Sequence, residues 1–553
     1  MPEPESLSIP SVAAPPVGAS SFTGRLGPWL AVLPIALITA VPVLVVLSAL
    51  AHPDQTIWEH LWKHVLPELL VNTAWLVLGV GLGVTLLGVS LAWLTAVCDY
   101  PGRRFFAWAL LLPLALPAYV TAFVWLGLFD FTGPVATWLR ESFGILKPPP
   151  VRSRSGVILV MTLALYPYVY LTSRAAFLGQ GRRLMEAAQS LGQSRWHAFL
   201  KVALPMARPG IVAGLLLAVM ETLADFGTVS VFNYNTFTTA IYKAWFSLFS
   251  LPAASQLASM LIFFVFVVAL LEYQTRASAS YAASSRAAAA PSRIALKGWQ
   301  AGLALAWSAL VFGLAFVMPV WQILDWALNV FEQDFDARYL DFAWHSLLLA
   351  GLGALLVGTL ALVLGYAQRL HPTSAMRVAA RLSTLGYALP GAVLAVGIFI
   401  PVAWLDNQLI ERLGLEGQVL GGTLAVMLLA YCARFLAVSF GPVDAGLGRI
   451  SKSIDEAAQS LGVVGARRLW RVHLPMLRVP LLTAAALTFV DVMKELPITL
   501  MTRPFGWDTL AVRVFEMTSE GEWERAALPA AAIAIVGLLP VFMLIRHADH
   551  AHT

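Results

Sequence analysis

Four acidic residues interrupt apolar stretches of this 553-residue sequence at matching places in its two halves. They are Glu221 and Asp225 in the first half, and Asp491 and Glu495 in the second. A spacing of four residues places the members of each pair on one face of a helix. Ionisable groups at membrane depth are costly and normally face a bundle interior or a water-filled cavity. Four carboxylates around one axis would line a polar path that attracts cations and suits hard, oxygen-seeking metal ions.

The same acids have a second interpretation, which we weigh equally with the first. Gly227 and Pro497 follow the two pairs closely, so the acids could cap helix ends or hold a break together by hydrogen bonds. Lys494 could also neutralise one acid of the second half. A tight metal centre is disfavoured because a path must release what it carries, so no metal-ligand set is assigned.

The segments that carry these acids are unusually short apolar spans. Arg208–Met220 and Arg478–Val490 are both shorter than the roughly 20 residues that cross a bilayer core. A span interrupted by acids and then by Gly or Pro, at the same position in both halves, is the best sequence indicator of a translocation site.

The composition predicts that lipid surrounds most of the chain. It is 59% hydrophobic and 12% charged, with a mean hydropathy of +0.75, whereas soluble domains carry about 25% charged residues. We therefore expect an all-α polytopic membrane protein with about 12 transmembrane helices. The expected spans are 28–50, 70–97, 105–129, 155–178, 207–225, 256–273, 298–325, 344–367, 376–404, 419–440, 477–495 and 526–546.

The charge distribution predicts an orientation and excludes nucleic-acid binding. The net charge is +5, but the 36 basic residues are scattered between apolar spans and form no stripe on one face. Most of them fall on one side of the predicted spans, including the loops 179–206 and 441–476, which places these loops and the N-terminus in the cytoplasm. Cys98 and Cys432 have neither a disulfide nor a metal-ligand spacing, and we interpret them as packing residues.

The chain contains an internal repeat. Glu186 to Gly192 reads EAAQSLG, and the identical seven residues recur from Glu456 to Gly462. The match continues at the same offset through Leu204-Pro205-Met206 and Leu474-Pro475-Met476. Six spans in each half give the two repeats the same topology, related by an axis along the membrane normal.

The repeated loops resemble the EAA loops of binding-protein-dependent ABC transporter permeases. The matching positions are Glu186, Ala187, Ala188, Gly192, Leu204 and Pro205 in the first EAA loop (179–206) and Glu456, Ala457, Ala458, Gly462, Leu474 and Pro475 in the second EAA loop (441–476). Val202 and Val472 stand where the family more often has Ile. Each loop is predicted to form a short helix, a glycine C-cap and a second helix ending at the proline. A plain amphipathic loop on the membrane surface is the alternative.

The resemblance implies a function and partners. The two EAA loops would dock on two separate ATP-binding cassette ATPase subunits, which use ATP and Mg²⁺, while this chain binds no cofactor. A periplasmic or surface-tethered binding protein would deliver the substrate to a chain in the bacterial cytoplasmic membrane. The stretches from Glu221 and from Asp491 look like those of fused ferric iron permeases, and permeases for thiamine or aminoethylphosphonate are the alternatives.

The implied organisation is a disordered cytoplasmic tail (1–27), a first permease repeat (28–274), a cytoplasmic linker (275–297), a second permease repeat (298–546) and a C-terminal tail (547–553). The sequence has no GxxxxGK[ST], HExxH or GxSxG motif, so we expect a transport subunit and not an enzyme. A secondary carrier is the remaining rival, but it would not need two EAA loops. The outer loops 233–239 and 503–509 are expected either to contact the binding protein or to pack as re-entrant loops.

Overall fold

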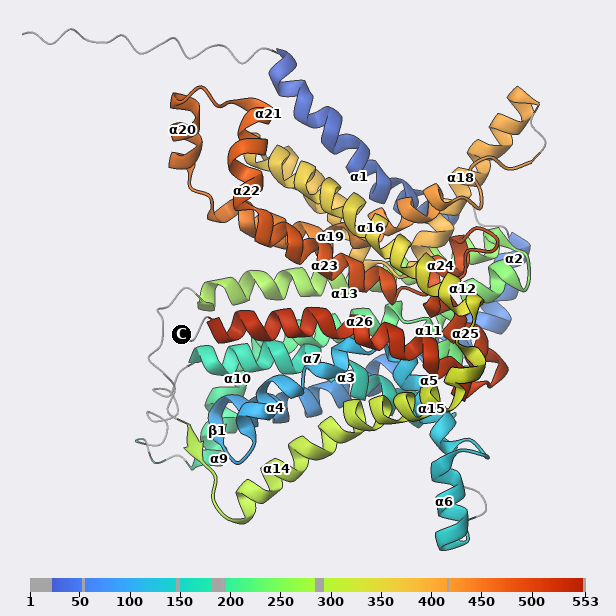
Figure 1. Cartoon of the computed structure of the whole chain (residues 1–553), viewed down its shortest axis with the longest axis vertical. Helices are drawn as coiled ribbons and strands as arrows, with labels where there is room; N and C mark the ends of the chain where they lie inside the picture. Colours follow the sequence, from blue (N-terminus) through green and yellow to red (C-terminus); the bar gives the residue numbers. More distant parts are fainter. Residues whose placement is uncertain are drawn as a thin grey trace, which may run out of the picture.

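The computed structural model describes residues 22–51, 55–145, 150–180, 190, 192, 194–283, 293–414 and 417–550. These residues are almost entirely helical (Figure 1), and the all-α membrane architecture predicted from composition is confirmed. Ten helices are long and apolar enough to cross a membrane, or eleven if a pair bent by 75° is counted as one span. The twelfth expected span, 526–546, lies within the last helix, where side chains from residue 539 onward are outside the description.

The described residues of the first half form sixteen elements, in which η1 and η3 are π-helical turns and η2 is a 3₁₀ turn. They are α1 (Phe22–Ala51), α2 (Gln55–His60), η1 (Leu61–Val65), α3 (Leu66–Val97), β1 (Cys98–Asp99), α4 (Arg103–Ala109), η2 (Leu112–Ala115), α5 (Ala118–Phe129), α6 (Pro134–Phe143), α7 (Arg154–Gln180), α9 (Arg195–Ala198), η3 (Phe199–Ala203), α10 (Leu204–Ala224), α11 (Gly227–Val231), α12 (Phe237–Phe246) and α13 (Leu251–Ala283).

In the second half, η4 and η6 are π-helical turns and η5 is a 3₁₀ turn. Its elements are β2 (Ile294–Ala295), α14 (Trp299–Phe312), η4 (Gly313–Val317), α15 (Met318–Asp334), α16 (Ala337–Leu370), α17 (Ser374–Thr384), η5 (Leu385–Ala388), α18 (Gly391–Leu413), α19 (Leu424–Arg449), α20 (Lys452–Ser460), α21 (Gly465–Arg468), η6 (Leu469–His473), α22 (Leu474–Met476), α23 (Arg478–Met493), α24 (Pro497–Thr502), α25 (Leu510–Glu520) and α26 (Trp523–His550).

The expected boundaries can be placed on these elements. α1 begins at Phe22, within the segment expected as a tail, and residues 1–21 and 551–553 lie outside the described residues. α13 continues to Ala283, inside the segment expected as a linker. The same segment contains β2, which pairs in parallel with β1 and ties the start of the second half to the first.

Each half has a core of three long helices in close contact. In the first half α7 packs against both α3 and α10, and in the second half α16, α19 and α23 pack against one another. Glycine permits the closest approach: a Cβ at Gly88 of α3 would lie 2.9 Å from the backbone nitrogen of Tyr170 in α7. Small residues at helix contacts are the usual means of close packing in lipid.

The first helix of each half packs against the opposite half. α1 contacts α16, α17 and α18, whereas α14 and α15 contact α3, α4 and α5. Polar contacts occur at both places: the Thr39 hydroxyl donates to the Ser383 carbonyl (3.0 Å), and the Tyr100 and Ser308 hydroxyls lie 2.9 Å apart. The halves therefore hold each other through exchanged helices.

Every π-helical turn in the described residues stands directly before an X-Pro pair. The prolines are Pro67, Pro205, Pro319 and Pro475, after η1, η3, η4 and η6 respectively. A proline within a helix lacks an N–H and its ring clashes with the carbonyl four residues earlier. That carbonyl falls inside the widened π turn, so the chain passes the proline and remains helical.

This corrects one expectation about the EAA loops. The second short helix was predicted to end at Pro205 or Pro475. In the second loop α22 ends at Met476, one residue after Pro475, where the chain bends by 75°, but in the first loop Pro205 lies in the first turn of α10 and the chain stays helical. The π turn removes the steric reason for stopping at the proline.

Candidate functional site

All four predicted intramembrane acids line one cavity of about 180 Å³ between the two halves. The first half contributes residues from η2, α5, α7, α10 and α11, and the second half contributes residues from η5, α19 and α23 and from the segment leading into α24. We call this the central cavity, and its charged lining residues are Glu221, Asp225, Arg434, Asp491, Lys494 and Glu495. The sequence argument thus placed the acids together correctly, although it said nothing of Arg434.

The second acid of each pair lies beyond the end of its helix. α10 ends at Ala224 and α23 ends at Met493, so Asp225 and Glu495 do not continue the helix faces of Glu221 and Asp491. The argument from a spacing of four residues was therefore wrong in geometry. The helices break before the second acid because that acid serves the next helix.

Asp225 and Glu495 accept hydrogen bonds from the short helices that follow the breaks. The Asp225 carboxylate accepts from the Val229 backbone N–H at 3.1 Å and the Thr228 hydroxyl at 2.9 Å. The Glu495 carboxylate accepts from the backbone N–H groups of Ile498 at 3.0 Å and Thr499 at 3.2 Å. Carboxylates at this position satisfy N–H groups that a helix start leaves without partners.

Glu221 and Asp491 lie in the last turns of α10 and α23, and their surroundings differ. Asp491 forms an ion pair of 2.9 Å with Lys494. Within the described part of the chain, no hydrogen bond or ion pair reaches the Glu221 carboxylate. Glu221 is therefore the acid of the central cavity without a direct polar contact, although Arg434 and Lys494 are close enough to attract it.

Arg434 is a cavity residue that the sequence analysis missed. It lies in the middle of α19, donates a short hydrogen bond to the Leu389 carbonyl, and its buried Nε has no partner among the described atoms. Its position in an apolar span was a signal, because an arginine at membrane depth is rarely structural. When Val160-Met161 is aligned with Val426-Met427, Arg434 corresponds in sequence to Tyr168 of α7. Tyr168 also lines the cavity.

The cavity is consequently asymmetric in charge. Both of its cations come from the second half, while the wall from the first half carries only acids. Four carboxylates against two cations leave the lining net negative when all are ionised. In the residues that the structure describes, no group of three or more His, Cys, Asp or Glu side chains is arranged to hold a metal ion.

The EAA loops lie at one end of the molecule. In Figure 1, α9 of the first loop and α20 and α21 of the second are all at the left, whereas the breaks before α11 and α24 lie toward the right. Glu186, Ala187 and Ala188 are outside the described residues. Leu204 and Pro205 begin α10, and Gly192 adopts a φ of 79°.

The second EAA loop is described in full. Glu456 and Ala457 are exposed on α20, Ala458 is buried, and Gly462 follows the helix with a φ of 72°, the left-handed conformation of a glycine C-cap. Leu474 and Pro475 lead into the bend before α23.

The same loop exposes apolar side chains. Leu461 is 81% exposed, and Val464 and Trp470 are also exposed. Apolar side chains gathered beside an exposed acid on a loop outside the apolar spans form a surface suited to a protein partner.

The loops 233–239 and 503–509, expected to face outward, are largely packed. Thr236, Phe237 and Thr239 are buried, and Thr236 and Thr239 form a capping box at the start of α12. Arg503 forms ion pairs with Asp508 and Glu516, whereas Phe505 is fully exposed. These contacts fit the re-entrant alternative for the first loop and leave Phe505 as an exposed residue of the second.

Fold and site together define a polytopic helical transport protein built from two repeats that share one charged cavity. Residues 85–277 and 358–551 each match the family described as "Binding-protein-dependent transport system inner membrane component", and the chain belongs to that family.

Bacterial transport permeases match either most of the chain or one half. A Haemophilus influenzae protein, "Fe(3+)-transport system permease protein FbpB 2", is 29% identical over 89% of this chain and 92% of its own length. The "Ferric transport system permease protein FbpB" of Actinobacillus pleuropneumoniae is 22% identical over 78% of this chain, which spans only 64% of that relative. The Escherichia coli "Molybdenum transport system permease protein ModB" is 30% identical over 33% of this chain and 80% of its own length.

Proposed function

We propose that this chain is the channel-forming subunit of an ATP-driven importer of ferric iron. In this proposal the central cavity is the substrate path, and the two EAA loops bind two ATP-binding cassette ATPase subunits that use ATP and Mg²⁺. A binding protein outside the cytoplasmic membrane delivers the cargo, and the N-terminus and both EAA loops face the cytoplasm. The whole-length similarity to a ferric permease is the observation that carries the choice of substrate.

The chemistry of the cavity supports this cargo. Ferric iron is a hard cation that prefers oxygen ligands, and the lining offers four carboxylates. Glu221 is available, while Asp491, Asp225 and Glu495 are already engaged by Lys494 or by helix starts. A single available carboxylate suits passage, because a complete ligand set would hold the ion.

The exposed surface of the second EAA loop supports the coupling role. Glu456, Leu461 and Val464 are accessible at the end of the bundle where α9 also lies (Figure 1). An ATPase subunit seated there could push on α23, which begins at the 75° bend after this loop and carries Asp491 into the cavity. We expect Glu186 and Glu456 to be required for coupling.

A radiolabelled uptake screen in cells lacking this chain tests the substrate. Complementation should restore uptake of ferric iron, and restored uptake of thiamine or 2-aminoethylphosphonate alone would overturn the choice of iron. Uptake that needs ATP and the ATPase subunits is expected. Uptake abolished by an uncoupler without loss of ATP would instead indicate a secondary carrier.

Substitution of Glu186 and Glu456 by alanine tests the coupling role. Both variants should insert normally and transport poorly. Normal transport by both variants, with the ATPase subunits still attached, would contradict the role assigned to the EAA loops.

A further inference from the structure

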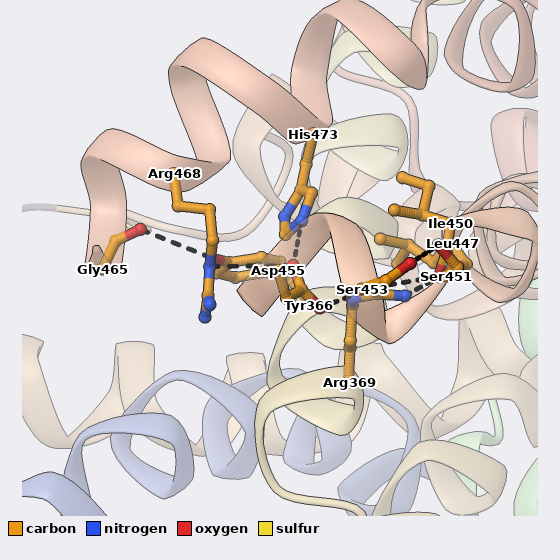
Figure 2. A network of polar contacts seen from close by, with 10 residues as sticks. All are labelled: Tyr366, Arg369, Leu447, Ile450, Ser451, Ser453, Asp455, Gly465, Arg468 and His473. Atoms are coloured by element: carbon orange, nitrogen blue, oxygen red, sulfur yellow. Dashed lines mark hydrogen bonds and ion pairs between the residues drawn. The ribbon is translucent and has the colours of Figure 1, made fainter. Parts of the chain in front are cut away.

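Asp455, the residue before the EAA sequence of the second loop, lies at the centre of a charged network (Figure 2). Its Oδ2 accepts a hydrogen bond of 2.6 Å from Arg369 Nη2, and its Oδ1 lies 2.7 Å from His473 Nε2 and 3.8 Å from Arg468 Nε. The Asp455 side chain is 21% exposed and that of His473 only 1%. One carboxylate thus joins three basic side chains that are largely withdrawn from water.

The partners of Asp455 come from separate elements. Arg369 lies in the last turn of α16, Arg468 ends α21, and His473 ends η6. Asp455 itself lies in the first turn of α20. The carboxylate therefore links α20 to α21 and η6, which follow it in the same loop, and to the long helix α16.

Arg369 extends the network to α19. Its Nη1 donates to the Leu447 carbonyl at 2.6 Å and its Nη2 to the Ile450 carbonyl at 3.0 Å. These carbonyls lie at the C-terminal end of α19, where a cation is favoured by the helix dipole. Arg369 therefore binds α20 and the end of α19 at the same time.

Tyr366 completes the contacts one turn earlier on α16. Its ring packs edge-on against His473 with centroids 5.5 Å apart, and its hydroxyl donates to the Gly465 carbonyl at 3.4 Å. α16 in turn packs along α19 and α23, two helices that line the central cavity. A displacement of α20 would consequently be transmitted to the cavity walls through packed helices.

The first EAA loop has no such set of charges in its sequence. At the offset that aligns the two EAAQSLG segments, Asp455, Arg468 and His473 correspond to Met185, Ala198 and Ala203. Met185 lies outside the described residues, so this comparison is one of residue types only. The repeats therefore keep the same motif residues and differ in the residues that would fix the motif helix in place.

We propose that Asp455 is a positioning residue that makes α20 and the adjoining ends of α16 and α19 move as one body, so that the second EAA loop transmits force more rigidly than the first. This rests on the proposed function, because it assumes that an ATPase subunit acts on α20. Removing the carboxylate would leave two arginines nearly buried without their counter-charge, which is costly.

The test uses the intact complex of this chain with its ATPase subunits in proteoliposomes. Asp455→Asn keeps the shape of the side chain and removes its charge, and Asp341→Asn makes the same change at an exposed carboxylate of α16 outside both EAA loops. We expect Asp455→Asn to retain the ATPase subunits but to lower the substrate moved per ATP hydrolysed by about tenfold, a usual size for a coupling between sites. Asp341→Asn should change this ratio less than about twofold.

Hydrogen exchange on the same samples supplies a structural readout. Asp455→Asn should speed exchange in residues 452–460 and leave α11 unchanged. An unchanged ratio of transport to hydrolysis would overturn the proposal, whatever the exchange shows.

Two further variants keep the outcome decisive. If Asp455→Asn does not assemble, Arg369→Lys retains the charge and loses the forked geometry, and the same loss of coupling is expected of it. An unchanged ratio in Arg369→Lys would then overturn the proposal. Glu456→Ala is measured in parallel: if it uncouples transport and Asp455→Asn does not, only the positioning role fails, whereas if neither does, the proposed function itself fails.

Discussion

Among single residues, Glu221 and Asp491 occupy equivalent places but differ in what surrounds them. Removing the charge of Asp491 leaves the Lys494 cation in the cavity without its partner. Removing the charge of Glu221 takes away an acid that has no hydrogen bond or ion pair in the described residues and that only the longer-range attraction of Arg434 and Lys494 reaches. A cation should therefore meet a higher barrier in Asp491→Asn than in Glu221→Gln, and the highest in the double variant.

The size of this effect follows from Coulomb's law. Two charges 4 Å apart interact by about 1 kcal/mol in water and about 4 kcal/mol at an effective permittivity of 20, and about 1.4 kcal/mol corresponds to tenfold. Each loss should therefore slow initial uptake by roughly fivefold to several hundredfold, with the larger effect in Asp491→Asn. Initial rates of radiolabelled uptake measure it, with Asp341→Asn as a control at an exposed acid of α16. Equal rates in the double variant and the original protein would show that Glu221 and Asp491 do not set the barrier of the path.

The pH dependence of stability should reveal Asp455. Burial of the Asp455 carboxyl raises its pKa, but hydrogen bonds from Arg369 and His473 outweigh burial and hold the pKa below its ordinary value. A lowered pKa in the folded state means stabilisation that is complete above the unfolded value of about 4 and is lost as the pH falls through the folded value. Arg468 and Tyr366 are the other titratable groups that face this site.

Thermal unfolding of the purified protein between pH 7 and pH 3 checks this expectation. Asp455→Asn should lower the Tm by a few degrees at pH 7, and the gap to the original protein should close below about pH 4. Asp341→Asn, at an exposed acid of α16, should run parallel to the original protein. A gap that stays constant over the whole range would show that the carboxylate charge is not what stabilises the loop.

Sequence reasoning found residues whose place follows from a local, repeated pattern and missed those whose place depends on how helices pack. Glu221 and Asp491 were visible because acids interrupt apolar stretches at a repeated place. Arg434 was equally visible as a charge in an apolar span, but its approach to the cavity depends on how α19 packs against the other half. Arg468 turns inward to Asp455, a contact between elements that no local pattern contains.

Among the elements, the π turns before proline were not foreseen, because the sequence signal of Leu-Pro is the same for a helix that stops and one that widens. Their positions in the chain indicate a role. η3 and η6 stand at corresponding positions of the two EAA loops, whereas η1 directly precedes α3 and η4 directly precedes α15. A π turn adds one residue to a helical turn, so closing it would rotate the flanking segments by about 100° relative to each other.

Pro475→Ala tests this role. Alanine restores the N–H and removes the ring, so η6 can close into a regular α-helix and turn α20 and α21 relative to α23. We expect the complex to assemble and the substrate moved per ATP to fall by roughly fivefold. Pro67→Ala makes the same change after η1, far from the EAA loops, and should leave the ratio unaltered; an equal loss in both variants would indicate general damage to the fold.

At the scale of the whole molecule, the repeat predicted a pseudo-symmetric pair of bundles but not how they are joined. The match of EAAQSLG fixed which segments are equivalent, and the two family matches agree with it. The exchange of α1 and of α14 and α15 between the halves could not be read from the sequence, since every one of these helices is apolar on most of its surface. Contacts such as that between Thr39 and Ser383, which join α1 to the other half, exist only in the folded chain and could not be found in the sequence.

The exchanged helices predict that the covalent link between the halves is dispensable once the protein has folded. A protease site inserted between Ala283 and Arg293 cuts the chain after α13 and before β2. Because α1 packs on α16, α17 and α18, and α14 and α15 pack on α3, α4 and α5, each fragment remains held through helices that lie in the other's bundle. Size-exclusion chromatography in mild detergent should show the two fragments eluting together at the position of the uncut protein, with uptake retained in proteoliposomes. Fragments that separate after cutting would show that the exchanged helices contribute little, and that the two repeats depend on their linker to stay together.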